Sequence, residues 1–175
     1  MRTIGSFVRL GWRDRANQAL KFFMAYRNPP GWRQWAEVAY REPRAPRYIG
    51  DLPHTWVGSD FVRSVLDMLA YERDRDSALV VAAGVPWSWI QGSGRTTVRD
   101  LRTSYGALGY SMRARGDAVQ VALEPGLRLP PGGIVVVPPA LRPFRSATID
   151  GKAAPITAEG GVVVRTLPAR VVMRP

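Results

Sequence analysis

The spacing of apolar residues changes once along this chain, near Ala78, and the change separates two unlike parts of its 175 residues. Before Ala78, apolar residues recur every three or four positions, as they do on one face of a helix. After Ala78, short apolar runs are separated by glycine and proline, a pattern typical of β-strands. The sequence therefore predicts an α+β chain, with a helical segment at residues 1–77 and an antiparallel β-sandwich domain at residues 78–175.

Three helices are expected in the first part. The first covers residues 3–10 and stops at Gly11, and the second runs from an N-cap at Asp14 to about residue 27, so the two form a helical hairpin. The third begins at Ser59 or Asp60 and continues to Glu72. The alternating charges of residues 72–76 indicate a solvated helix end and a domain seam. The second helix carries one apolar stripe that must pack against another helix, and it consists of Ala16, Ala19, Leu20, Phe23 and Tyr26.

The second part contains one strong hairpin signal. Residues 110–115 and 118–123 alternate in character and flank Gly116 and Asp117, which suit a tight turn. A strand is expected at residues 78–83, and further strands at 133–137, 146–149, 162–165 and 171–173. Short strands with turns at this spacing predict an antiparallel sandwich or roll.

The chain is strongly basic, with a formal net charge of +11, and a basic surface attracts nucleic acid. Only Lys21 and Lys152 are lysines, which leaves 23 arginines, and these are scattered from Arg2 to Arg174. Because nucleic-acid modules concentrate their basic residues, we expect no specific nucleic-acid partner, although a basic nucleic-acid binder stays open as an alternative. The chain lacks cysteine, so disulfides and thiolate chemistry are excluded.

No apolar run reaches the length of a membrane span or of a signal-peptide core. We therefore expect a soluble chain without a membrane partner, and the sequence leaves its compartment undetermined.

The connection between the second and third helices concentrates the residues that could carry chemistry. Tryptophan and tyrosine stack on the apolar faces of sugars, and carboxylates act as acid, base or nucleophile in glycoside hydrolysis. The simpler interpretations are a surface carboxylate for Glu37, a loop-bonding imidazole for His54 and a helix cap for Asp60. Because His54 is the only histidine, a metal site built on several imidazoles is excluded, and no metal or cofactor is expected. The cluster comprises Trp32, Trp35, Glu37, Tyr40, Asp51, His54, Trp56 and Asp60.

Three motifs in this order resemble the end of a six-hairpin (α/α)6-toroid glycosidase of the α-L-rhamnosidase-like kind. The first is Trp32-x-x-Trp35-x-Glu37, the second is Gly50-Asp51-Leu52-Pro53-His54-Thr55-Trp56-Val57-Gly58, and the third is a helix followed by a strand-rich tail. The resemblance implies the last toroid helices followed by a C-terminal β-sandwich. It assigns Glu37 as the catalytic carboxylate and His54 as a substrate ligand, and Asp51 of the second motif is a further candidate substrate ligand. The implied sugar platform consists of Trp32, Trp35 and Trp56.

A complete toroid needs about twelve helices of typical length, whereas only about three fit before Ala78. Glycoside hydrolysis normally takes two carboxylates across the scissile bond, and the resemblance places the second one in an earlier hairpin. The first hypothesis is therefore a C-terminal portion of a glycoside-hydrolase-like, carbohydrate-active protein that is inactive by itself. The alternative is a noncatalytic carbohydrate-binding or structural β-sandwich module. The expected partners are carbohydrate and either a second copy of the chain or the missing toroid portion.

Overall fold

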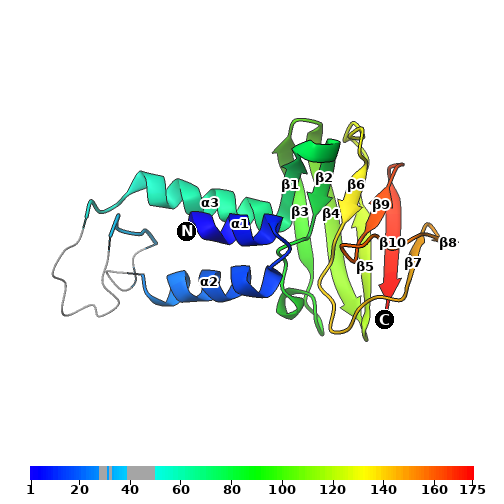
Figure 1. The fold of residues 1–175 in the computed structure, drawn as a ribbon, viewed down its shortest axis with the longest axis horizontal. Helices are drawn as coiled ribbons and strands as arrows, with labels where there is room; N and C mark the ends of the chain where they lie inside the picture. Colours follow the sequence, from blue (N-terminus) through cyan, green and yellow to red (C-terminus); the bar gives the residue numbers. More distant parts are fainter. Residues whose placement is uncertain (28–30, 32, 39–49) are drawn as a thin grey trace. The chain divides into compact units, whose positions relative to one another are not determined.

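The computed structural model describes residues 1–27, 31, 33–38 and 50–175 and divides them into two compact units (Figure 1). The helical unit is Met1–Asp67 and the sandwich unit is Met68–Pro175. Candidate residues Trp32 and Tyr40 lie outside the described residues. The structure confirms the expected α+β fold with a sandwich-like arrangement of strands.

The helical unit contains α1 (Arg2–Arg9), α2 (Arg13–Ala25) and most of α3 (Thr55–Leu69). The chain reverses between α1 and α2 at Gly11, whose φ of 76° suits glycine, so the expected helical hairpin is present. None of the described helices combines the length and the apolar character needed to cross a membrane.

Paired charges align α1 with α3. Arg9 donates from Nε and Nη2 to the two carboxylate oxygens of Asp67, at 3.1 and 2.8 Å. Two helical turns earlier on both helices, Arg2 donates to Asp60 at 3.3 Å. A Cβ atom at Gly5 would lie 2.6 Å from Asp67 Oδ2, so glycine permits the close approach of the two helices. These contacts advance in the same direction along both helices, and α1 and α3 are therefore parallel.

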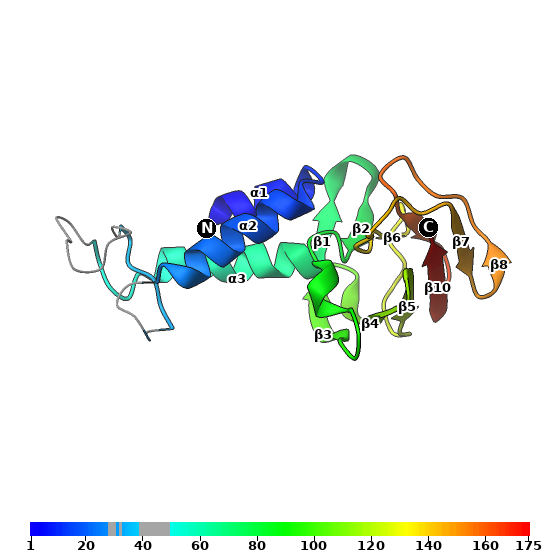
Figure 2. The same cartoon turned by 90° about the horizontal axis from the view of Figure 1, so that it is seen from below.

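The sandwich unit contains two sheets, which Figure 2 shows as facing layers. The smaller sheet has the strand order β1-β2-β6-β9, and the larger sheet has the order β3-β4-β5-β10-β7-β8. The strands of the smaller sheet are β1 (Ala70–Arg73), β2 (Ala78–Val81), β6 (Ile134–Val136) and β9 (Val162–Val164). Those of the larger sheet are β3 (Thr96–Thr103), β4 (Gly106–Arg115), β5 (Ala118–Leu123), β10 (Ala169–Arg174), β7 (Ser146–Ile149) and β8 (Lys152–Ala153).

One strand pair departs from the purely antiparallel arrangement that the sequence predicts. β2 and β6 are parallel, with Val80 opposite Val135. All residues of both strands are buried, and continuous apolar runs of this kind are typical of parallel strands. The remaining pairs are antiparallel, including the expected hairpin of β4 and β5.

Tyr110 links the two sheets through the core between them. Its side chain is fully buried, and its hydroxyl donates at 2.8 Å to the carbonyl of Leu69, directly before β1. The same carbonyl accepts a bond from the amide of Ala82 at the end of β2. Burial raises the pKa of Tyr110, so the phenol stays neutral and acts as a donor.

The predicted end of the third helix is wrong. α3 begins at Thr55 and ends at Leu69, and the chain then enters strand β1, where Tyr71 pairs with Val80. The charged run is a short turn within the sandwich unit, since Arg73 bonds both Asp76 and Glu159. The bond from Arg73 also lowers the pKa of Asp76. The division between the units falls after Asp67, ten residues before the predicted seam at 77/78, because β1 belongs to the smaller sheet.

Candidate functional site

Two short backbone segments bring the candidate residues together in the helical unit. The amide of Glu37 donates to the carbonyl of Asp51 at 3.0 Å, and the amide of Gly50 donates to the carbonyl of Val38 at 3.2 Å. The amide of His54 donates to the carbonyl of Trp35 at 3.1 Å. Residues 35–38 therefore lie beside residues 50–54, and five of the six candidate residues that the structure describes are on or next to these segments.

Glu37, Asp51 and His54 form a small polar cluster. One ligand atom from each of the three side chains lies within 4.8 Å of the other two. Zinc sites in proteins combine imidazole nitrogen and carboxylate oxygen ligands, and this cluster offers one such nitrogen and two such oxygens. Glu37 and Asp51 are exposed and His54 is half-buried. The cluster as it stands is a solvated group of hydrogen-bonding side chains.

Asp51 places a second carboxylate close to Glu37, although the sequence predicts only one catalytic carboxylate in this chain. Retaining glycosidases place two carboxyl groups about 5 Å apart, a separation that this pair could reach. A general acid in such a site normally owes its function to a pocket that excludes water. Both side chains here are exposed, so the arrangement offers hydrogen bonds to hydroxyl groups more readily than acid catalysis.

His54 makes a backbone hydrogen bond of the kind that the simpler interpretation of its sequence position expects. Its Nδ1 atom accepts a hydrogen bond at 3.3 Å from the amide of Val57, in the first turn of α3. This is the geometry of an N-cap, which satisfies an amide that has no partner within the helix. The cap lies earlier than the expected one at Ser59 or Asp60. Only Nε2 of His54 is left to meet a ligand.

Trp35 is an anchor of the loop and does not serve as an exposed sugar platform. It is 9% exposed, and its Nε1 donates at 3.1 Å to the carbonyl of Phe23 in α2. Its ring lies 4.5 Å from that of Phe61 in α3, and the guanidinium of Arg27 lies 5.7 Å from the ring centre. No local sequence pattern predicts these partners, since they are distant in the chain. Trp35 thus ties the candidate segment to two helices.

Trp56 has the exposure that a sugar platform needs. Its side chain is 63% exposed, and Arg2 lies 5.7 Å from the centre of its ring. It follows His54 by two residues, in the first turn of α3. The structure therefore separates the described tryptophans of the predicted platform into a buried anchor, Trp35, and an exposed ring, Trp56.

Comparisons of the chain with protein-family models, with curated proteins and with solved structures give no match. The resemblance to toroid glycosidases consequently rests on the motif residues alone.

Replacement of His54 separates its capping role from a role in binding. We expect His54→Ala to destabilise the helical unit by about 1 kcal/mol, because the amide of Val57 loses its acceptor. His54→Ser should recover most of this loss, since serine is a good N-cap residue. Urea unfolding followed by helical circular dichroism measures the effect. Equal stability of the wild type and His54→Ala would contradict the capping role.

Proposed function

We propose that this chain is a noncatalytic portion of a larger, glycoside-hydrolase-like, carbohydrate-active protein, in which the helical unit completes its core against further helices. The observation that carries the proposal is the apolar surface that the helical unit leaves exposed. The motif resemblance supports a toroid as the source of those helices.

The helical unit exposes more large apolar side chains than it buries. Among its described residues, the buried apolar ones are Ile4, Val8, Ala16, Trp35 and Ala36, of which two are alanines. The exposed large ones are Leu10, Trp12, Phe22, Met24, Tyr26, Val38, Trp56, Val62 and Leu66. Full burial of a large apolar side chain contributes about 1.5–3 kcal/mol, so this unit forgoes much of the stabilisation that its sequence offers.

The sandwich unit shows the opposite balance. Its core is continuous between the two sheets, and its exposed large apolar residues are Trp89 and Leu141. The contrast within one chain indicates that the exposure is a property of the helical unit. Exposed apolar side chains in such number support a site of association in the helical unit.

The end of α2 exposes apolar residues on more than one side. The rings of Phe22 and Tyr26 lie 4.7 Å apart, one helical turn from each other, while Met24 projects from the opposite side. Phe22 is 48% exposed and Met24 is 40% exposed. A helix that is apolar around its circumference is normally surrounded by other elements. The expected stripe that included Phe23 is therefore wider than one packing partner can cover.

Helices of the same kind would suit this surface. A helical hairpin packed along α2 would cover Phe22 and Tyr26, and another along α3 would cover Val62 and Leu66, which are one turn apart. In the absence of such helices, a second copy of the chain offers the same apolar chemistry. The proposal thus predicts self-association of the chain by itself.

Self-association can be tested by changing the exposed residues. We expect the chain to form dimers or larger species at micromolar concentration, because association buries apolar surface. The double substitution Phe22→Ser with Val62→Ser should shift it toward monomer with a small loss of stability, since about half of each side chain is already exposed. Sedimentation velocity over a range of concentrations measures the shift, and Leu141→Ser in the sandwich unit is the matched control. A monomeric wild-type chain at high concentration would contradict the proposal.

The exposed ring of Trp56 favours carbohydrate binding as a second candidate function. Its ring is 63% exposed, so a sugar could stack on the part that Arg2 does not cover, and His54, Asp51 and Glu37 offer hydrogen-bonding atoms in the neighbouring segment. A binding module needs no catalytic pair, so this function is compatible with the exposed carboxylates.

Trp56→Ala tests this second candidate. A panel of rhamnose-containing and other plant or bacterial oligosaccharides is titrated into the chain, and binding is measured by calorimetry. We expect the loss of the indole ring to remove measurable binding, because stacking supplies apolar contact that small polar residues cannot replace. Trp89→Ala, an exposed tryptophan of the sandwich unit, is the control. Binding that survives Trp56→Ala and disappears in Trp89→Ala would move the sugar site to the other unit.

A further inference from the structure

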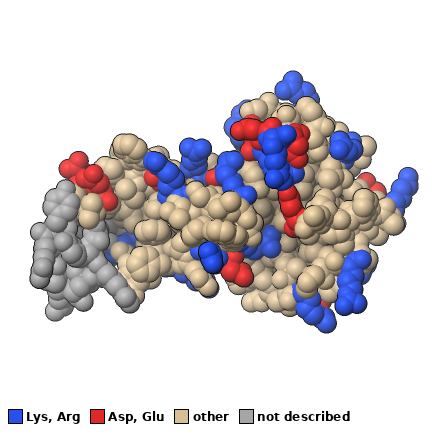
Figure 3. Space-filling model, in the orientation of Figure 1, with Lys and Arg blue, Asp and Glu red and all other residues tan. Residues whose placement is uncertain are grey.

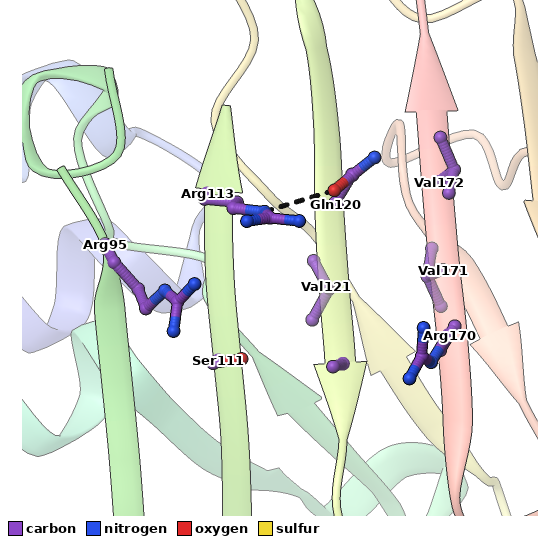
Figure 4. A pocket seen from close by; sticks show the side chains of 9 residues that line it. Arg95, Ser111, Arg113, Gln120, Val121, Arg170, Val171 and Val172 are labelled. Carbon is purple, nitrogen blue, oxygen red and sulfur yellow. Dashed lines mark hydrogen bonds between the residues drawn. The ribbon is translucent and has the colours of Figure 1, made fainter. Parts of the chain in front are cut away.

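A hollow on the outer face of the larger sheet brings together three arginines. Its volume is about 310 Å³, within the ~300–1,000 Å³ usual for small-molecule sites. The walls come from Arg95, directly before β3, and from β4, β5 and β10, all within the sandwich unit (Figure 4). The lining residues are Arg95, Ser111, Arg113, Gln120, Val121, Ala122, Arg170, Val171 and Val172.

The strand register explains why the sheet is hollow at this place. Ser111 of β4 lies opposite Ala122 of β5, and Ala122 lies opposite Arg170 of β10. Two short side chains therefore stand side by side in the middle of the face. The next row places Arg113 opposite Gln120. Long arginine side chains thus surround a floor of small residues.

The arginines extend toward the hollow from different strands. Figure 4 shows Arg95 and Arg170 reaching inward from opposite sides, with Arg113 between them. Gln120 Oε1 accepts a bond of 3.2 Å from Nε of Arg113, which orients that guanidinium. β3 and β10 are three strand spacings apart, or about 14 Å at ~4.8 Å per spacing. Their side chains can therefore approach one ligand from two sides.

The guanidinium groups of the hollow, those of Arg95, Arg113 and Arg170, have no acidic ion-pair partner among the described residues. The nearby carboxylate of Asp150 accepts a hydrogen bond of 2.8 Å from the backbone amide of Arg170, and not from its guanidinium. Elsewhere in the same unit, Arg73, Arg75 and Arg142 each have an acidic partner. Like charges gathered without partners repel one another, and a bound anion would relieve this repulsion.

We propose that this hollow binds the phosphate group of a small phosphorylated molecule. Guanidinium groups match the oxygens of a phosphate with paired, charge-assisted hydrogen bonds. The Ser111 hydroxyl and the Gln120 amide add neutral donors. The lining holds no aromatic ring, so it lacks the stacking surface that sugar rings and nucleobases use.

The size of the hollow argues against a long polyanion as the ligand. On the face of the molecule that Figure 3 shows, the basic side chains lie at separate places, several of them beside acidic ones. A nucleic-acid track would continue as a stripe of positive charge. A ligand confined to one hollow of this volume fits a small molecule better.

The test measures binding of simple phosphates to the full chain by calorimetry at constant ionic strength. The probes are inorganic phosphate, pyrophosphate and glycerol phosphate, with sulfate and citrate as the other anions. We expect saturable binding of one phosphate-containing probe per chain, weakened about tenfold or more by Arg170→Gln. Arg99→Gln is the control, because it removes the same charge from an exposed position of β3 outside the hollow.

A second variant tests the hollow independently of charge. Ala122→Leu fills the floor and leaves the net charge unchanged, so it should also abolish binding. Thermal unfolding of each variant shows whether the sandwich unit remains folded. Arg170→Gln should not change the unfolding temperature, because no described protein group bonds the guanidinium of Arg170. If sulfate binds as tightly as inorganic phosphate, the hollow is a site for tetrahedral oxyanions. In that case, tighter binding of glycerol phosphate than of sulfate identifies a phosphate ester as the ligand.

Three results would overturn the proposal. The first is unsaturable binding that Arg99→Gln and Arg170→Gln weaken equally, since this is nonspecific charge attraction. The second is a preference for citrate over every phosphate. The third is binding that is restricted to long polyanions such as heparin and is unaffected by Ala122→Leu.

Discussion

Burial of apolar surface is the constraint on which this structure depends, and the two units meet it to different degrees. The sandwich unit buries Leu79, Tyr110, Met112, Ile134 and Met173 between its two sheets. The helical unit has a small buried set and fixes its helices partly by charge, through the pairs of Arg2 with Asp60 and Arg9 with Asp67. The pair of Arg2 with Asp60 contributes little to stability because Arg2 is exposed, whereas Asp67 is 7% exposed and accepts two hydrogen bonds from Arg9. Both pairs fix the parallel alignment of α1 and α3, but they do not replace the stabilisation that large buried apolar side chains supply.

The small core of the helical unit explains why the candidate site is open to solvent. The segments around Glu37 and His54 are held by backbone hydrogen bonds and by the anchor Trp35, while their polar side chains remain exposed. In the proposed larger protein, further helices would pack against α2 and α3 and would supply the missing wall of a sugar site. The chain by itself retains the hydrogen-bonding groups and the exposed ring of Trp56 without that wall.

The sequence predicted much of the fold because local patterns determine it. Alternation in residues 110–123 predicted the β4–β5 hairpin, and residues 146–149 are strand β7 as expected. Long-range pairing determined what was missed. The run Ala70–Arg73 continues a helical pattern locally, yet it becomes strand β1 because β2 is available as its partner. β3 escaped prediction because Arg99, Asp100 and Arg102 interrupt its alternation at an irregularity in the β3–β4 pairing.

The sequence predicted that the candidate residues lie near one another, but not which of their side chains are buried. The proximity of Glu37, Asp51 and His54 agrees with their placement in one connection, whereas the burial of Trp35 depends on Phe23 and Phe61, which are distant in sequence. The arginine hollow was missed because Arg95, Arg113 and Arg170 come together only through the strand order β3-β4-β5-β10. Scattered positions in sequence thus concealed a local concentration of charge.

Amide hydrogen exchange on the dilute chain tests most directly whether the helical unit lacks a complete core. Protection of an amide reflects the free energy of the opening that exposes it. The account predicts that amides in the last two turns of α2, around Phe22, exchange much faster than those of β4, β5 and β10. Protection of these α2 amides equal to that of β4 in the monomeric chain would contradict it, because the helical unit would then be stable without a partner.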